Sequence, residues 1–90
     1  MLDIVSSNRF KKDLKLAIKR GYNIQLLDGV VNQLAMQMQL EEKYKDHELS
    51  GNFKGFRECH ITPDWLLIYQ IIDNELLLYL SRTGTHSDLF

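Results

Sequence analysis

The chain is poor in the residues that mark several whole classes of protein. It has one cysteine, Cys59, so it forms no internal disulfide, a usage that fits a reducing compartment. One proline and five glycines among 90 residues argue against a disordered chain. No apolar run approaches the roughly 18 residues of a membrane-spanning helix, so we expect no membrane partner. The N-terminus lacks the pattern of a signal peptide, and we therefore expect a cytoplasmic protein.

Nor does the chain carry the basic surplus that nucleic-acid-binding proteins usually have. Its formal net charge is −1 at pH 7, which taken alone argues against a nucleic-acid partner. The charges are unevenly spread, however, because residues 9–20 contain six Lys and Arg residues and one acidic residue, Asp13. A local basic face can attract phosphate even when the net charge is near zero.

The N-terminal part of the sequence has the pattern of a strand and an amphipathic helix. Residues 2–5 predict a short strand, and Ser6 or Ser7 can cap a helix over residues 7–20, where apolar residues recur at helical spacing. Another face of this helix carries a group of lysines, Lys11, Lys12, Lys15 and Lys19. These lysines form either an ordinary solvated face or a surface that binds RNA.

The rest of the sequence predicts a second helix and then three strands. Asn23 can cap the second helix, whose apolar stripe reaches Met38, so Met36 and Met38 are expected in or near the core. Strands are predicted over residues 52–61, 65–72 and 75–82, joined by short turns into an antiparallel meander. The middle strand is apolar on both faces and is therefore central.

These segments together predict one domain over residues 1–90. Its class is α+β, with the order β-α-α-β-β-β and a small, mainly antiparallel sheet packed against a helical hairpin.

Titratable and aromatic side chains gather at the ends of the predicted strands. If the last two strands pair, one corner of the sheet collects His60, Asp64, Trp65, Arg82 and His86. Imidazoles exchange protons near neutral pH, and an arginine can clamp a phosphate. Each residue also has an ordinary alternative, such as a turn hydrogen bond, core packing or a surface ion pair. The histidines lack the close spacing of common zinc motifs, so no metal site is predicted.

Four blocks of sequence, in a fixed order, carry a family resemblance. They are Tyr44–Gly51 (YKDHELSG), Lys54–His60 (KGFRECH), Pro63–Tyr69 (PDWLLIY) and Arg82–Phe90 (RTGTHSDLF). Together they resemble the YafQ branch of the RelE-like toxins of bacterial type II toxin–antitoxin systems, and the order of predicted elements matches as well. The resemblance implies a cytosolic endoribonuclease that cleaves mRNA, typically in the ribosomal A site, with no metal or other cofactor. It also implies a cognate antitoxin as partner. Through this antitoxin the protein can also bind operator DNA.

The resemblance also implies roles for particular residues. The expected catalytic group is His47, His60, Asp64, Arg82 and His86, and the expected substrate-binding group is Trp65, Phe90, Lys54 and Arg57. We assign His86 as general acid and His60 or Asp64 as general base, with His47 assisting. Arg82 would hold the scissile phosphate, Trp65 and Phe90 would stack on bases, and the lysines of the first helix would bind ribosomal RNA backbone.

Two other functions remain compatible with the sequence. The near-neutral net charge favours a ribosome-independent RNase of the same fold. The basic helix and Phe90 would equally serve an inactive module that binds an antitoxin or acts as co-repressor.

Overall fold

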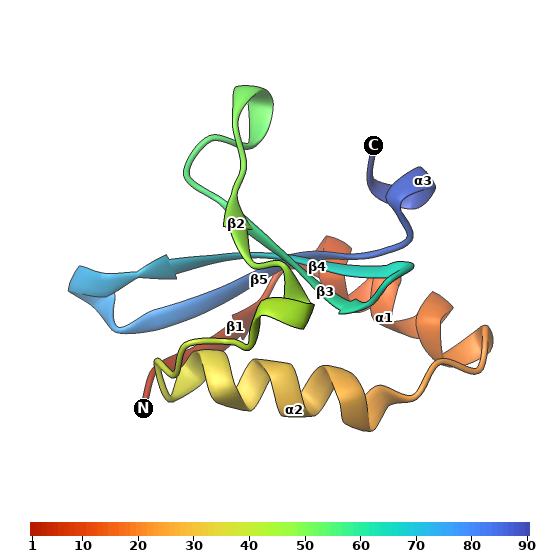
Figure 1. The fold of residues 1–90 in the computed structure, drawn as a ribbon, viewed down its shortest axis with the longest axis horizontal. Helices are drawn as coiled ribbons and strands as arrows, with labels where there is room; N and C mark the ends of the chain where they lie inside the picture. The colour runs from red at the N-terminus through yellow and green to blue at the C-terminus, as the bar shows by residue number, and fades with distance from the viewer.

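The computed structural model describes residues 1–90 and has the predicted α+β architecture. Its elements, in chain order, are β1 (Asp3–Ser6), α1 (Asn8–Lys19), α2 (Ile24–Ala35), β2 (His47–Glu48), β3 (Arg57–Thr62), β4 (Trp65–Ile72), β5 (Leu77–Gly84) and α3 (His86–Leu89) (Figure 1). The predicted order of two helices and three long strands is confirmed. The structure adds two short elements, the strand β2 and the C-terminal helix α3. No helix is long and apolar enough to span a membrane.

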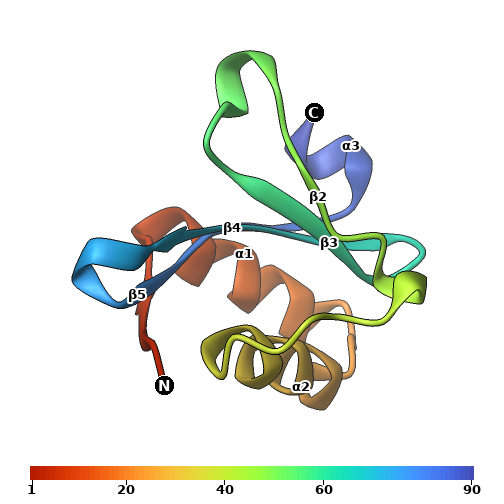
Figure 2. The same ribbon diagram turned by 60° about the vertical axis from the view of Figure 1, so that its left-hand side comes forward.

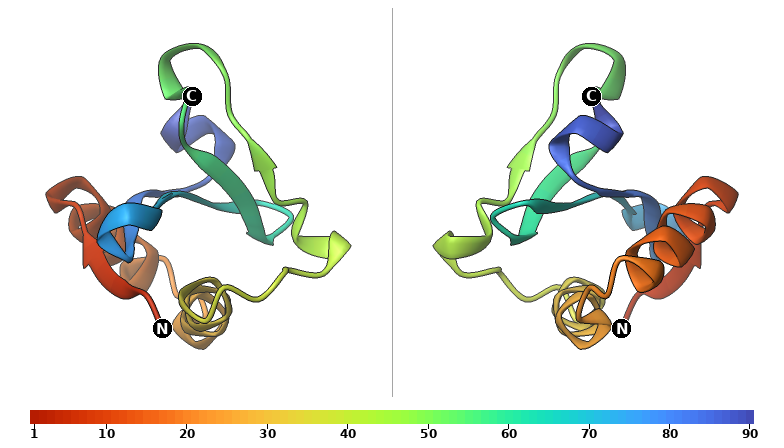
Figure 3. Two further views of the ribbon diagram at one scale, coloured as in Figure 1. Left: turned by 90° about the vertical axis from the view of Figure 1, so that its left-hand side faces the viewer. Right: turned by 90° about the vertical axis from the view of Figure 1, so that its right-hand side faces the viewer.

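One five-stranded sheet organises the molecule, with the order β1-β5-β4-β3-β2. The pair β1–β5 is parallel and the other three pairs are antiparallel, so β4 occupies the centre as its apolar sequence predicted. Helices α1 and α2 cover one face of the sheet, while α3 and the arm that contains β2 rise from the other face (Figures 2 and 3). This second face carries the candidate site described below.

The two long helices begin at the caps that the sequence predicted. The Ser7 hydroxyl accepts a hydrogen bond from the Phe10 backbone N–H (2.9 Å), and the Asn23 side chain accepts one from the Gln25 N–H (3.1 Å). These bonds satisfy amide groups that have no partner inside the first turn. Gly21, at φ +81°, ends the first helix in the left-handed region that glycine adopts most easily.

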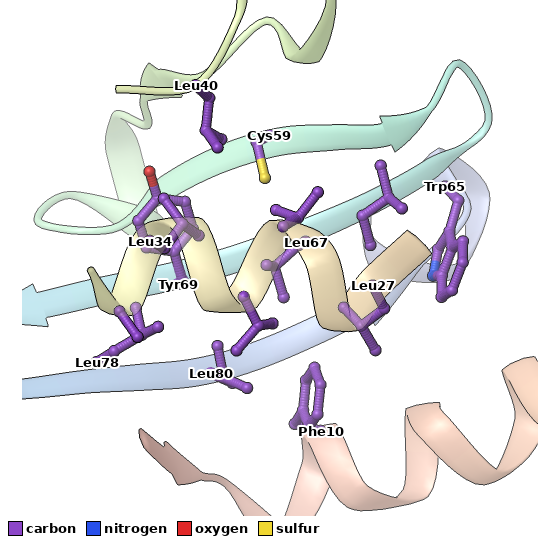
Figure 4. Close-up of a cluster of buried hydrophobic side chains, with 14 of the residues drawn as sticks. Phe10, Leu27, Leu34, Leu40, Cys59, Trp65, Leu67, Tyr69, Leu78 and Leu80 are labelled. Atoms are coloured by element: carbon purple, nitrogen blue, oxygen red, sulfur yellow. The ribbon is translucent and has the colours of Figure 1, made fainter. Parts of the chain in front are cut away.

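Strand alternation divides the buried side chains into two clusters. Trp65, Leu67 and Tyr69 of β4 face the helices and pack with residues such as Phe10 and Leu27 (Figure 4). Leu66 and Ile68 point to the opposite face, where a smaller cluster joins them to Leu89 of α3 and to Leu49, Phe53 and Phe56 of the β2–β3 arm. The second cluster therefore holds α3 and the arm on the same face of the sheet.

Some predicted boundaries and burials were wrong. Met36 and Met38 are 60% and 52% exposed, because α2 ends at Ala35 and Gln37 turns the chain with φ +59°. The first meander strand begins at Arg57, since residues 51–53 form a 3₁₀ turn and Gly55 has φ +95°. These interruptions break the alternation that a strand needs.

Candidate active site

A row of side chains crosses the sheet on the face opposite to α1 and α2. His47 of β2 pairs with Glu58 of β3, Glu58 pairs with Ile68 of β4, and Ile68 pairs with Arg82 of β5. Directly paired residues project to the same face, so the register assigns a histidine, a carboxylate and an arginine to this face, although the Arg82 guanidinium extends to Asp13 of α1. His60 lies two residues after Glu58 on the same strand and shares this face.

Glu58 is the centre of this group. Its Oε1 atom lies 3.6 Å from Nε2 of His47 and 3.7 Å from Nε2 of His60. The Glu58 side chain is only 7% exposed, and its Oε2 is buried without a hydrogen-bond partner. The Glu58 carboxylate thus lies between the two imidazole rings. Sequence reasoning missed Glu58, although its spacing of two residues from His60 in a strand was a usable signal.

His47 has a defined proton arrangement. Its Nδ1 lies 2.7 Å from the carbonyl oxygen of Lys45. A carbonyl oxygen only accepts hydrogen bonds, so Nδ1 carries a hydrogen and donates it. The other nitrogen, Nε2, faces Glu58 at 3.6 Å.

His86 begins α3, and Phe90 directly follows the helix. Their ring centroids are 5.0 Å apart, and the Phe90 ring also meets the edge of Phe53 from the β2–β3 arm at 5.4 Å. Phe90 is 52% exposed, so part of its ring is accessible to a base.

The carboxylate of Asp88 fixes the start of α3. Thr85 and Asp88 form a reciprocal capping box, and Arg20 at the end of α1 donates two hydrogen bonds to Asp88 at 2.6 and 3.2 Å. Hydrogen bonds from Arg20 and from the Thr85 backbone hold the pKa of Asp88 well below its usual range. The helix that carries His86 is thus tied to the helical layer.

Arg82 is held by a carboxylate of α1. Its Nε and Nη2 donate to Asp13 at 2.7 and 3.2 Å, and the Thr83 backbone N–H donates to the same carboxylate at 3.1 Å. Both side chains are largely buried, at 18% and 13% exposed. The guanidinium is therefore fixed in position, and Nη1 makes no hydrogen bond within the protein. Asp13 had stood out in the sequence only as the single anion of the basic segment.

Two predicted site residues, Asp64 and Trp65, lie on the other side of the sheet. Trp65 is 3% exposed and packs on Tyr22, and its ring N–H donates to Thr83 at 2.8 Å. Trp65 is therefore part of the core in this structure, and its stacking on a base stays a prediction. Asp64 lines a small pocket with Tyr22, Asn23 and Leu26. The residues of the predicted corner are thus divided between the two faces, because alternation along β4 sends Trp65 toward the helices while Leu66 and Ile68, which pair with His60 and Arg82, point to the opposite face.

The remaining predicted residues are exposed or engaged in ion pairs. Arg57 binds Asp46 (Nη2–Oδ2 3.0 Å) and Glu48 (3.5 Å), and its role in binding substrate stays a prediction. Lys54 is exposed and lines a cleft with Ser50 and Phe56. The lysines of α1 are all exposed, namely Lys11, Lys12, Lys15 and Lys19. No three His, Cys, Asp or Glu side chains have an arrangement that could hold a metal ion.

Comparison with known proteins identifies the family. Residues 2–90 match the family described as the bacterial toxin of type II toxin–antitoxin system, YafQ. The mRNA interferase toxin YafQ of Escherichia coli K12 is 44% identical over 89 residues, covering 98% of this chain and 95% of that protein. A structure described as a metal-bound toxin from Helicobacter pylori superposes with a TM-score of 0.95 at 52% identity, with full coverage of both chains. The E. coli DinJ–YafQ toxin–antitoxin complex matches with a TM-score of 0.89 at 43% identity, over 99% of this chain and 97% of that one. This chain therefore belongs to the YafQ family of bacterial type II toxin–antitoxin toxins.

Proposed function

We propose that this protein is an endoribonuclease toxin that cleaves mRNA by attack of a ribose 2′-OH on the adjacent phosphate. The observation that supports this most directly is the buried Glu58 carboxylate between His47 and His60, on the face of the sheet that also carries Arg82 and α3. The name of the E. coli relative, an mRNA interferase toxin, agrees with this assignment.

The chemistry needs a base, an acid and a cation. The group formed by His47, Glu58 and His60 removes the proton of the 2′-OH, because its imidazole nitrogens face a carboxylate that stabilises the charged ring. His86 protonates the 5′-oxygen that leaves, and Arg82 stabilises the phosphorane through the N–H groups that Asp13 leaves unused. The products are a 2′,3′-cyclic phosphate and a 5′-OH. Asp64 is a poorer candidate for the base because it lies on the other side of the sheet.

Binding of the RNA involves surfaces outside this group. Phe90 offers its exposed ring to a base, Lys54 contacts the RNA backbone near the β2–β3 arm, and the exposed lysines of α1 contact ribosomal RNA while the mRNA occupies the A site. An mRNA substrate places the protein in the cytoplasm. By analogy with the DinJ–YafQ complex, a cognate antitoxin neutralises it, and the resulting complex can bind operator DNA.

The metal bound to the H. pylori toxin raises the question of a metal here. In this chain two imidazoles face one carboxylate oxygen across 3.6 and 3.7 Å, but no three donor side chains have the arrangement of a metal site. The proposed steps are accordingly assigned to the side chains.

The test compares two substrates, a naked mRNA and the same mRNA under translation. We expect wild-type protein to cleave the translated mRNA and to leave a cyclic phosphate, and His86→Ala to lower the rate by about 100-fold or more. Ser87→Ala, at the neighbouring exposed position of α3, serves as the matched control and should cleave normally.

The other outcomes separate the alternatives. If wild-type protein cleaves naked RNA and His86→Ala does not, the protein is an RNase that does not need the ribosome. The net charge of −1 favours this alternative. Cleavage of neither RNA by folded wild-type protein would overturn the proposal in favour of a module that only binds an antitoxin.

A further inference from the structure

The short segment that carries His47 is anchored to the central strand by one side chain. Asp46 accepts a hydrogen bond from the Tyr69 hydroxyl (2.5 Å) on one oxygen and from Nη2 of Arg57 (3.0 Å) on the other. Tyr69 lies in the middle of β4 and is 1% exposed, so its hydroxyl is a fixed point of the core. Asp46 is consequently clamped between β4 and the first residue of β3.

The donors of this clamp keep their protons through the pH range in which the protein works. Burial, and then the hydrogen bond to Asp46, raises the pKa of Tyr69 well above its usual value. A guanidinium is always charged in proteins, and its hydrogen bond to Asp46 raises the pKa of Arg57 further. The clamp therefore does not loosen by titration of its donors near neutral pH.

The backbone on either side of Asp46 needs such an anchor. Lys45 has φ +50°, in the left-handed region that residues with a side chain adopt at a cost. In this conformation its carbonyl oxygen meets Nδ1 of His47 at 2.7 Å, and Nε2 of the same ring faces Glu58. A free histidine side chain in water does not prefer the form with the hydrogen on Nδ1, so the protein has to impose this tautomer.

We infer that Asp46, clamped by Tyr69 and Arg57, is a positioning residue that fixes the tautomer and the direction of the His47 ring. It acts through the backbone of residues 45–47 and has no contact with the substrate. The expected effect on catalysis rests on the proposed function. The expected tautomer of His47 does not, because it is a property of the free protein. It also gives Arg57 a role as part of the clamp.

The test uses the hydroxyl of Tyr69, which Tyr69→Phe removes while leaving the ring in the core. The matched control is Tyr79→Phe, which removes the hydroxyl of a partly buried tyrosine on β5 that lies outside the clamp. Nitrogen NMR of labelled imidazoles reports which nitrogen of His47 carries the hydrogen in the neutral ring. We expect Nδ1–H in wild type and Tyr79→Phe, and a mixture of the two tautomers in Tyr69→Phe. The kcat for RNA cleavage should fall by about 10- to 100-fold in Tyr69→Phe, with KM changed little.

A graded pair of variants at Asp46 guards against loss of folding. Asp46→Asn keeps an oxygen that can accept from Tyr69 and should retain part of the Nδ1–H form, whereas Asp46→Ala should lose it. An unchanged His47 tautomer in folded Tyr69→Phe and Asp46→Ala would overturn the inference. If the tautomer shifts as expected but no protein cleaves RNA, the positioning role stands and the proposed function fails.

Discussion

At the scale of single residues, the site stands out through a side chain whose burial is unfavourable. Glu58 leaves one carboxylate oxygen buried with no hydrogen-bond partner, an arrangement that costs stability. Such local violations are expected where function and stability compete. We take the buried charge of Glu58 to be retained for proton transfer at His47 and His60.

This account predicts opposite effects of one substitution on activity and stability. Glu58→Gln keeps the shape of the side chain and removes its charge, so cleavage should fall by about 10²- to 10⁴-fold. The melting temperature should stay the same or rise, because a buried charge disappears. Thermal unfolding and single-turnover cleavage measure the two effects, and Glu75→Gln, at an exposed turn position, is the control. A Glu58→Gln protein that is less stable yet fully active would contradict the assignment.

At the scale of elements, the position of α3, the helix that carries His86, depends on a close approach at Gly84. A Cβ atom at position 84 would lie 2.9 Å from Oδ2 and 3.0 Å from Cβ of Asp88, so the capping box and the bond from Arg20 depend on glycine. Gly84→Ala should displace α3 and lower the rate of cleavage by about 100-fold, while the core formed by β4 and the helices stays folded.

A second glycine provides the control for this substitution. Gly29 lies inside α2 with no atom within 4 Å of an added Cβ, so Gly29→Ala should raise the melting temperature through helix propensity and leave cleavage unchanged. Equal activity of the two glycine variants would show that the position of α3 does not matter for the reaction.

How far the sequence predicts these elements depends on the length of the pattern in each. The caps at Ser7 and Asn23 and the apolar run of β4 are local signals, and the structure confirmed them. The strand β2 has only two residues, and α3 four, too few for any periodicity to appear. The burial of Trp65 and the ion pair of Arg57 could not be predicted either, because they depend on which face a strand presents and on a partner, Asp46, that lies eleven residues away from Arg57.

At the scale of the whole molecule, the C-terminal helix is joined to the helical layer by the ion pair between Arg20 and Asp88. This pair and the smaller apolar cluster under Leu89 together connect the face that carries the site to the opposite face of the sheet. The stability of the folded protein should therefore depend on the charge of Asp88.

The sign of that dependence follows from the pKa of Asp88, which is lowered in the folded state by Arg20 and by the Thr85 backbone. A lowered pKa means that the contribution to stability is complete above the unfolded value of about 3.9 and is lost as the pH falls below it. Asp88→Asn should thus melt below wild type at pH 7, and the difference between the two melting temperatures should shrink steadily under about pH 4. Thermal unfolding of both proteins across this range measures it. A difference that stays constant down to acid pH would mean that the Asp88 side chain acts through its capping hydrogen bonds alone, and that its charge does not hold α3 in place.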